Sequence, residues 1–140
     1  MKKYIGTKVI EAKKAEKDGR KGYAVKYKDG YESWSPVEAF EEAYHCIDDG
    51  LTFGEAIQLM KKGAKIARKG WNGKGMFVVY QKGYPEGIPC NKQTAEAFGY
   101  KEGELFKCRP YMQMRCADGT HQMWVASQSD ILTEDWYVVE

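Results

Sequence analysis

The sequence predicts an α+β fold in which a mostly antiparallel sheet is combined with short helices. Strand-like runs follow one another across short turn signals such as Asp118-Gly119, which is typical of hairpins rather than of helical crossovers. The 140 residues are 43% hydrophobic and 14% aromatic, so the chain has enough apolar surface to build a core without disulfides or metal. We expect two parts, a small appendage over residues 1–48 and a larger domain over residues 51–140.

The appendage has the pattern of a strand–hairpin–helix unit. Residues 4–12 are rich in β-branched side chains, Lys17-Asp18-Gly19 offers a turn, and residues 23–27 continue as a strand. Asp29-Gly30 fits a two-residue hairpin turn, because glycine tolerates a positive φ, and residues 31–34 would form the return strand.

A helix is expected after this hairpin. Ser35 is the predicted N-cap, Pro36 the first helical residue and Glu38 the acid of a capping box. Apolar residues then recur on one face as far as Tyr44. They are few, so we expect the unit to rest against a larger body across the polar joint at residues 45–50.

The larger domain opens with a helix over residues 52–62. Thr52 and Glu55 form a second capping box, apolar residues recur at helical spacing, and Gly63 ends the helix. An extended segment over residues 64–69 follows.

Glycine and proline punctuate the rest of the chain. A glycine-dense turn at residues 70–75 leads into a strong strand over residues 76–80, and residues 81–90 are predicted to be a loop. Asn91 caps a short helix that ends near Gly99. The remaining expected elements, in order, are an irregular piece between Gly103 and Pro110, an alternating strand over residues 109–116, a strand containing Trp124, a helical turn from Ser127, and a final strand over residues 136–139.

Composition and charge exclude several functional classes. The formal net charge of +2 is too small to indicate duplex DNA binding, and no run of 18 apolar residues predicts a membrane span. The four cysteines form no C-x-x-C pair, and the two histidines supply no zinc spacing, so reduced thiols and no metal are expected. The basic run over residues 61–74 is either a solvated face or a contact for a phosphate-bearing partner.

The residues indicate binding rather than catalysis. The chain has no H-E-x-x-H, G-x-S-x-G or P-loop motif. Tryptophan rings can stack on bases, while lysine and arginine can meet phosphates. Trp71 lies between glycines with two polar neighbours, and Trp124 precedes a polar group. The alternative for each tryptophan is a position in the core or at an interface. The polar candidates beside these rings are Asn72, Lys74, Ser127, Gln128 and Asp130.

Several separated motifs then resemble one family. Residues 66–76 contain Gly70-Trp71-Asn72-Gly73. The opening of the second type of phage Thoeris anti-defence protein is similar to residues 52–63 and 66–76 of this chain. The closing half of that protein is similar to Pro110-Tyr111, residues 117–119 and residues 124–136. The resemblance therefore covers about residues 51–140. Residues 1–48 resemble a separate small phage domain of unknown role.

This resemblance implies a function that composition alone does not. Members of the family are sponges that bind the cyclic ADP-ribose isomer made by a bacterial immune TIR enzyme and hold it uncleaved; some relatives also bind cyclic dinucleotides at a second site. They are homotetramers with pockets between subunits, and they act in the cytoplasm of the infected host without a cofactor. Trp71 matches the family's stacking tryptophan and Trp124 its second pocket aromatic, while Lys74, Arg68 or Arg109 would meet the phosphates.

Two other functions remain open at this point. One is a hydrolase that degrades the same signal, with Asp130 and Glu134 as acids and His121 as the base. The other is a module that binds protein or single-stranded nucleic acid through the basic run over residues 61–74 and the tyrosines.

Overall fold

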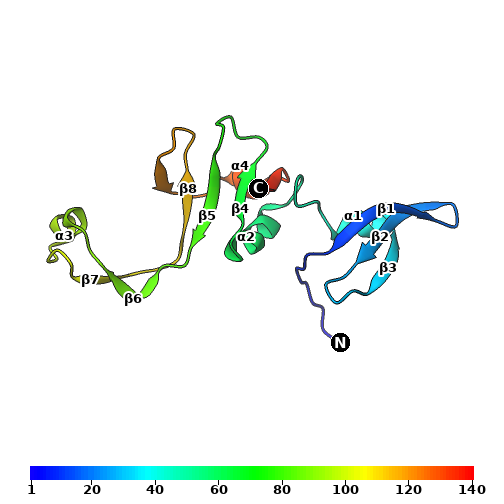
Figure 1. Cartoon of the computed structure of the whole chain (residues 1–140), viewed down its shortest axis with the longest axis horizontal. Coiled ribbons are helices and arrows are strands. Elements are labelled where there is room, and N and C mark those ends of the chain that lie inside the picture. Colours follow the sequence, from blue (N-terminus) through cyan, green and yellow to red (C-terminus); the bar gives the residue numbers. More distant parts are fainter.

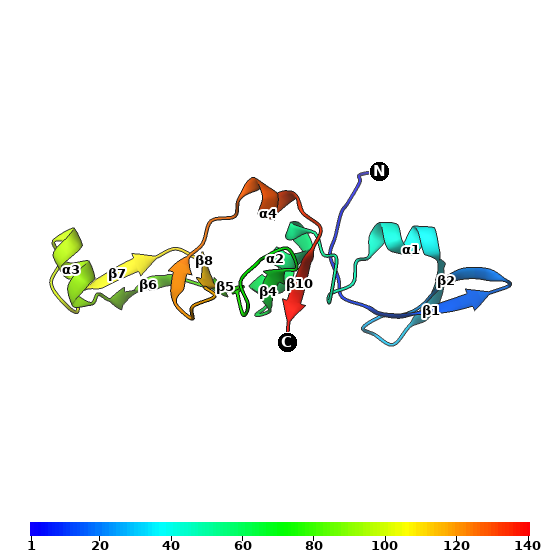
Figure 2. The same cartoon turned by 90° about the horizontal axis from the view of Figure 1, so that it is seen from above.

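The computed structural model describes residues 1–140 and has the predicted α+β class. The strands form three separate antiparallel sheets of three, five and two strands. The molecule is elongated, with the three-stranded sheet at one end, the five-stranded sheet in the middle and a two-stranded arm at the other end (Figure 1). The view from above shows the same succession (Figure 2).

The N-terminal sheet has the strand order β1-β2-β3 and is followed by a short helix. Its elements are β1 (Glu11–Lys17), β2 (Arg20–Lys26), β3 (Glu32–Pro36) and α1 (Val37–Ala43). Asp18 and Gly19 form the two-residue turn between β1 and β2, since Lys17 pairs with Arg20 and both turn residues have positive φ, 53° and 75°.

The predictions for this unit were wrong in three places. Asp29-Gly30 is not a two-residue hairpin turn, because residues 27–31 form a longer connection in which the Asp29 carboxylate accepts the Tyr31 N–H at 3.0 Å. Residues 4–10 are not part of a strand. Ser35 is not an N-cap, because it belongs to β3; Pro36 is the cap residue of α1 and provides no side-chain cap.

The central sheet has the order β10-β4-β5-β8-β9, with all pairs antiparallel. Its elements are α2 (Phe53–Lys61), β4 (Lys65–Arg68), β5 (Phe77–Gln81), β8 (Tyr111–Arg115), β9 (His121–Met123), α4 (Gln128–Leu132) and β10 (Trp136–Val139). The helix α2 begins at the predicted capping box of Thr52 and Glu55. Trp124 lies just beyond β9 rather than within a strand.

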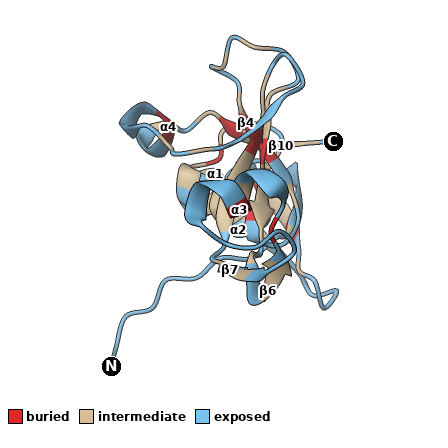
Figure 3. Ribbon diagram, turned by 90° about the vertical axis from the view of Figure 1, so that its left-hand side faces the viewer, coloured by how far each residue is buried: buried red, intermediate tan, exposed pale blue.

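The core lies between α2 and one face of this sheet. Met60 of α2 packs with Ile66, Val78, Met114 and Trp136, all of which are almost fully buried. Some of the buried residues lie in β4 and at the start of β10 (Figure 3). This core positions the end of β4, the start of β10 and the loop that follows β4.

The arm is a ribbon with a helix at its tip. Its elements are β6 (Tyr84–Pro89), α3 (Lys92–Phe98) and β7 (Leu105–Cys108). The loop predicted over residues 81–90 and the irregular piece before Pro110 are therefore strands in part. Proline is tolerated because a two-stranded ribbon has only edge strands, and the pairing shifts register between Tyr84 and Ile88 around Gly87. Asn91 and Gly99 cap α3 as predicted.

Candidate functional site

Four aromatic rings meet beside the core of the central sheet. Trp71, Trp124 and Trp136 are mutually edge-to-face, with ring centroids 5.3–6.0 Å apart. Phe53 of α2 adds a fourth ring, 5.3 Å from Trp136 and 6.3 Å from Trp124. Trp136 is fully buried, whereas Trp71 and Trp124 are half-buried and offer part of their rings to solvent.

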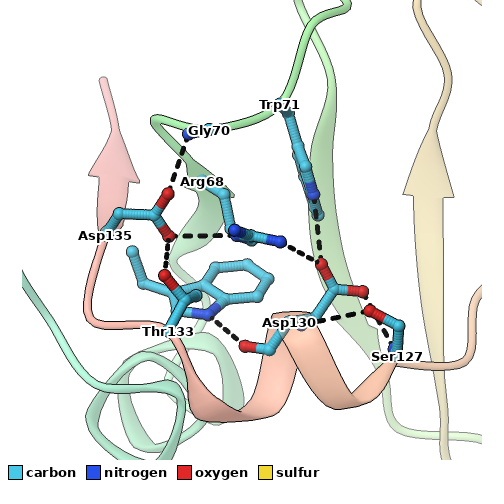
Figure 4. A network of polar contacts seen from close by, with 8 residues as sticks. Arg68, Gly70, Trp71, Ser127, Asp130, Thr133 and Asp135 are labelled. Carbon is cyan, nitrogen blue, oxygen red and sulfur yellow. Dashed lines mark hydrogen bonds and ion pairs between the residues drawn. The ribbon is translucent and has the colours of Figure 1, made fainter.

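The Asp130 carboxylate holds this cluster in place. One oxygen accepts Arg68 at 2.7 Å and the indole N–H of Trp71 at 3.3 Å, and the other accepts the backbone N–H of Ser127 at 2.9 Å (Figure 4). The Ser127 hydroxyl accepts the Asp130 N–H in return, which forms the capping box of α4. The backbone oxygen of Asp130 accepts the indole N–H of Trp136 at 2.8 Å.

A second carboxylate completes what we call the aspartate network, which joins Arg68, Asp130 and Asp135 to their bonded neighbours. The Asp135 carboxylate accepts Arg68 Nε at 3.0 Å, the Gly70 N–H at 2.8 Å and the Thr133 hydroxyl at 2.9 Å (Figure 4). Arg68 therefore lies between two aspartates that come from α4 and the start of β10. The network fixes the loop after β4 against the C-terminal part of the chain.

Both aspartates remain charged at neutral pH. Burial alone would raise the pKa of Asp130, but the bonds from Ser127, Arg68 and Trp71 outweigh it and hold that pKa below its ordinary value. Burial likewise opposes ionisation of Asp135, yet Arg68, Thr133 and the Gly70 N–H lower its pKa overall. The Asp135 bond contributes most to a raised pKa for Arg68.

The loop over residues 70–75 approaches its neighbours so closely that side chains would not fit at two positions. A Cβ on Gly70 would lie 2.7 Å from the Asp135 carboxylate, and a Cβ on Gly73 would lie 2.8 Å from that of Ala117. Arg115 donates to the Gly75 carbonyl at 2.8 Å from the opposite side. The loop thus presents Trp71 from a backbone that is held at both ends.

The comparisons with known proteins decide the family of this chain. A model of the Thoeris anti-defense 2-like domain matches residues 51–139. The chain belongs to the Thoeris anti-defense 2-like family. It is also 34% identical over 92 residues to Thoeris anti-defense 2 of Bacillus phage SP01, which covers 64% of this chain and 94% of that protein. Family membership supports an anti-defence role.

Within this Thoeris anti-defense 2-like domain, the structure brings together five of the residues singled out from the sequence. Those five are Arg68, Trp71, Trp124, Ser127 and Asp130, all in the ring cluster or the aspartate network. Asn72 and Lys74 are exposed on the loop, and Gln128 is exposed at the first position of α4. Arg109 is exposed before β8, at the base of the arm, and takes no part in the network.

Sequence reasoning missed Asp135, Thr133 and Phe53. Asp135 and its neighbour Glu134 both lie just before β10, in the bend that follows α4. The bend there lets Asp135 turn toward β4. No local signal marks the bonds to Arg68 and Gly70, because both residues are more than 60 positions away from Asp135 in sequence.

The residues named for hydrolysis do not converge. His121 pairs with Arg115, which is the neighbour of the core residue Met114, so His121 points to the sheet face opposite the core. Asp130 lies on the core side and is bonded to Arg68. Glu134 is exposed and outside the network.

The lysine run over residues 61–74 is likewise divided. Lys61 ends α2 on the core side of the sheet, whereas Lys65 lies over the Phe77 ring and Lys69 over the Tyr137 ring at 5.2 and 4.0 Å. No cluster of three or more candidate metal ligands occurs in the chain. None of its helices is both long and apolar enough to cross a membrane.

Proposed function

We propose that this protein binds and sequesters a cyclic ADP-ribose isomer made by a TIR immune enzyme, and that it holds the signal without cleaving it. The observation that carries the proposal is the pair of half-buried rings, Trp71 and Trp124, which pack edge-to-face where the glycine-rich loop presents Trp71. Rings that are fixed before binding lose little entropy on stacking against a base. Sequestration of this signal would block Thoeris-type immunity in the host cytoplasm.

The state of the carboxylates favours binding over hydrolysis. A general acid must carry a proton near the working pH, yet the pKa values of Asp130 and Asp135 are lowered by their bonded partners. Both carboxylates are also occupied by Arg68. They are suited to positioning Trp71 and the loop, and the proposed roles of Asp130 and Ser127 are of this kind.

The cations have different roles in this proposal. Arg68 is paired with two aspartates, so its charge is already neutralised. Its main role in this proposal is to hold the loop in place rather than to bind a phosphate. Lys74 is exposed on the loop and free to meet a diphosphate, with Asn72 and Gln128 as polar contacts to the sugar or base. Arg109 would contribute from a neighbouring subunit, because within one chain it lies at the opposite end of β8 from the loop.

Three further features belong to the same proposal. Residues 51–140 form the signal-binding domain and residues 1–48 a separate appendage. The active form is a homotetramer, in which pockets between subunits enclose a ligand too large for one short domain. Cyclic dinucleotides are a second ligand class.

A release assay tests sequestration directly. The protein is mixed with the TIR product, free ligand is removed by filtration, and the protein is then heated to unfold it. Intact signal recovered in near-stoichiometric amount supports the proposal. Recovery of cleaved products would show a hydrolase, and failure to bind would overturn the choice of ligand.

Variants of Trp71 separate stacking from positioning. Trp71→Ala should weaken binding at least tenfold by removing the stacking surface. Trp71→Phe keeps a ring but loses the bond to Asp130, so it should bind with intermediate affinity. Tyr31→Ala, an exposed aromatic of the N-terminal unit, is the matched control and should bind normally. Normal binding by a folded Trp71→Ala protein would exclude Trp71 from the site.

A further inference from the structure

A large cleft of the chain lies outside the candidate signal-binding site. It is a cleft of about 1200 Å³ between the N-terminal unit and α2, and neither Trp71 nor Trp124 lines it. One wall is the extended segment over residues 6–12, another is the end of α1, and the floor contains Leu51 and Leu59. The family domain supplies only one side of this cleft, so its contents are not explained by the signal-binding site.

The joint between the two units gives the cleft fixed walls. His45 Nδ1 lies 2.8 Å from one carboxylate oxygen of Glu55 and 2.9 Å from the other, and the same carboxylate caps α2. The Ile47 carbonyl accepts the Val138 N–H at 2.9 Å, which ties the joint to the edge strand β10. The cleft is therefore built into the structure.

An aromatic stack lines the side contributed by the N-terminal unit. Tyr23 and Phe40 are stacked with ring centroids 4.0 Å apart, and Tyr44 continues the stack 5.1 Å from Phe40. All three rings line the cleft and are only half-buried. The solvent-exposed parts of such rings attract ammonium and guanidinium groups.

The charge of the cleft is opposite to that of the whole chain. Five carboxylates line it against two lysines, although the chain carries a net charge of +2. Glu41 is bonded to the Tyr23 hydroxyl and Glu55 to His45. The other three carboxylates have no partner in the structure; they are Glu11, Asp48 and Asp49.

The extended wall offers unpaired backbone. None of the backbone hydrogen bonds involves residues 1–10, and β1 pairs only from Glu11 onward. Ile5 is fully exposed and Val9 is half exposed. An extended segment with free N–H and C=O groups beside a groove can pair with an incoming strand.

We propose that this cleft binds an extended, lysine- or arginine-rich segment of a partner protein. The segment would pair with the backbone of residues 6–10 and place its cationic side chains against Glu11, Asp48 and Asp49 and over the Tyr23–Phe40–Tyr44 stack. The N-terminal unit is thereby a recruitment surface, separate from the sequestration of the signal. Its function does not depend on which nucleotide the family domain binds.

Binding of defined peptides to the full chain tests this inference. The probe is a fluorescein-labelled octapeptide of alternating Lys and Val, and the control probe alternates Glu and Val. Fluorescence anisotropy should show saturable binding of the lysine peptide alone, with an affinity that falls as salt is raised. Equal binding of the two peptides, or no binding of the lysine peptide, would overturn the proposal.

Two variants locate the site. The triple change Glu11→Gln, Asp48→Asn and Asp49→Asn removes only exposed carboxylates without partners and should weaken the lysine peptide about tenfold. Its control is Glu86→Gln, Glu96→Gln and Glu102→Gln, three exposed carboxylates of the arm, which should have no effect. Val9→Pro removes a backbone N–H from the pairing edge and should also weaken binding. An unchanged affinity in either cleft variant, with normal circular dichroism, would overturn the proposal.

Discussion

The N-terminal unit and the central sheet are both small antiparallel assemblies with one helix packed beside them, but they are stabilised differently. The central sheet buries a cluster that includes Met60, Ile66 and Trp136 beneath α2. The N-terminal sheet has one buried hydrophobic residue, Val25, and otherwise relies on half-exposed rings. The central sheet therefore has a core of its own, whereas the N-terminal unit leaves several aromatic rings half-exposed.

The largest expected effect is on the core of the central sheet. Trp136→Ala should destabilise the protein by about 3–5 kcal/mol, because it empties a fully buried site and removes the bond to Asp130. Val25→Ala should cost only about 2 kcal/mol, since it deletes two buried methyl groups. Urea unfolding followed by circular dichroism measures both.

The two variants should also unfold in different ways. Val25→Ala should produce an early transition confined to the N-terminal unit, and Trp136→Ala should lower the main transition. A single transition that shifts equally in both variants would show that the two sheets unfold together, which would contradict their separate stabilisation.

The aspartate network should give the next largest effect. Arg68→Met keeps the length of the side chain but leaves Asp130 and Asp135 without their cation, which should cost about 2 kcal/mol of unfolding free energy. Arg109→Met is the matched control on an exposed arginine and should change stability by less than about 0.5 kcal/mol. Similar values for the two variants would mean that the network contributes little to stability.

The same network predicts a loss of stability in acid. Because the pKa values of Asp130 and Asp135 are lower in the folded chain, the folded state binds fewer protons than the unfolded state near pH 4. Stability from this source is complete well above pH 4 and is lost as the pH falls through the lowered values. Asp135→Asn should make the acid decline of the thermal midpoint shallower between pH 5 and pH 2.

Glu134→Gln supplies the control for that pH profile. Glu134 is the exposed neighbour of Asp135 and has no partner in the network. Its replacement should leave the acid decline unchanged, and a decline that follows Glu134 rather than Asp135 would contradict the assignment.

The elements that could be predicted from sequence are those specified by local chemistry. The capping box at Thr52, the caps of α3 and the strand before Gln81 were all confirmed, since neighbouring residues determine them. The arm was missed because Pro85 and Gly87 read as loop signals when their pairing partners are unknown. Ribbon formation depends on β7, about 20 residues farther along the chain.

The candidate site likewise has residues that the sequence could predict and residues that only the fold reveals. Trp71 and its glycines were found because they lie side by side in the sequence. The pairing of Arg68 with Asp130 and Asp135 joins residues more than 60 positions apart, so spacing could not reveal that this arginine is already neutralised. Phe53 lies in the helix that the apolar spacing predicted, and only the fold shows that its ring contacts Trp124 and Trp136.

The smallest predicted effect compares two helix starts that look alike in sequence. Thr52→Ala should cost about 1 kcal/mol, because the Thr52 hydroxyl accepts the Glu55 N–H at 3.2 Å and begins α2. Ser35→Ala should cost less than about 0.5 kcal/mol, because Ser35 belongs to β3 and α1 has no side-chain cap. Both are read from urea unfolding, with the Ser35 variant assessed on the transition of the N-terminal unit. A loss of unfolding free energy in Ser35→Ala as large as that in Thr52→Ala would show that Ser35 is a helix cap after all. Both helices would then begin at a side-chain cap, whereas the structure shows such a cap at α2 and not at α1.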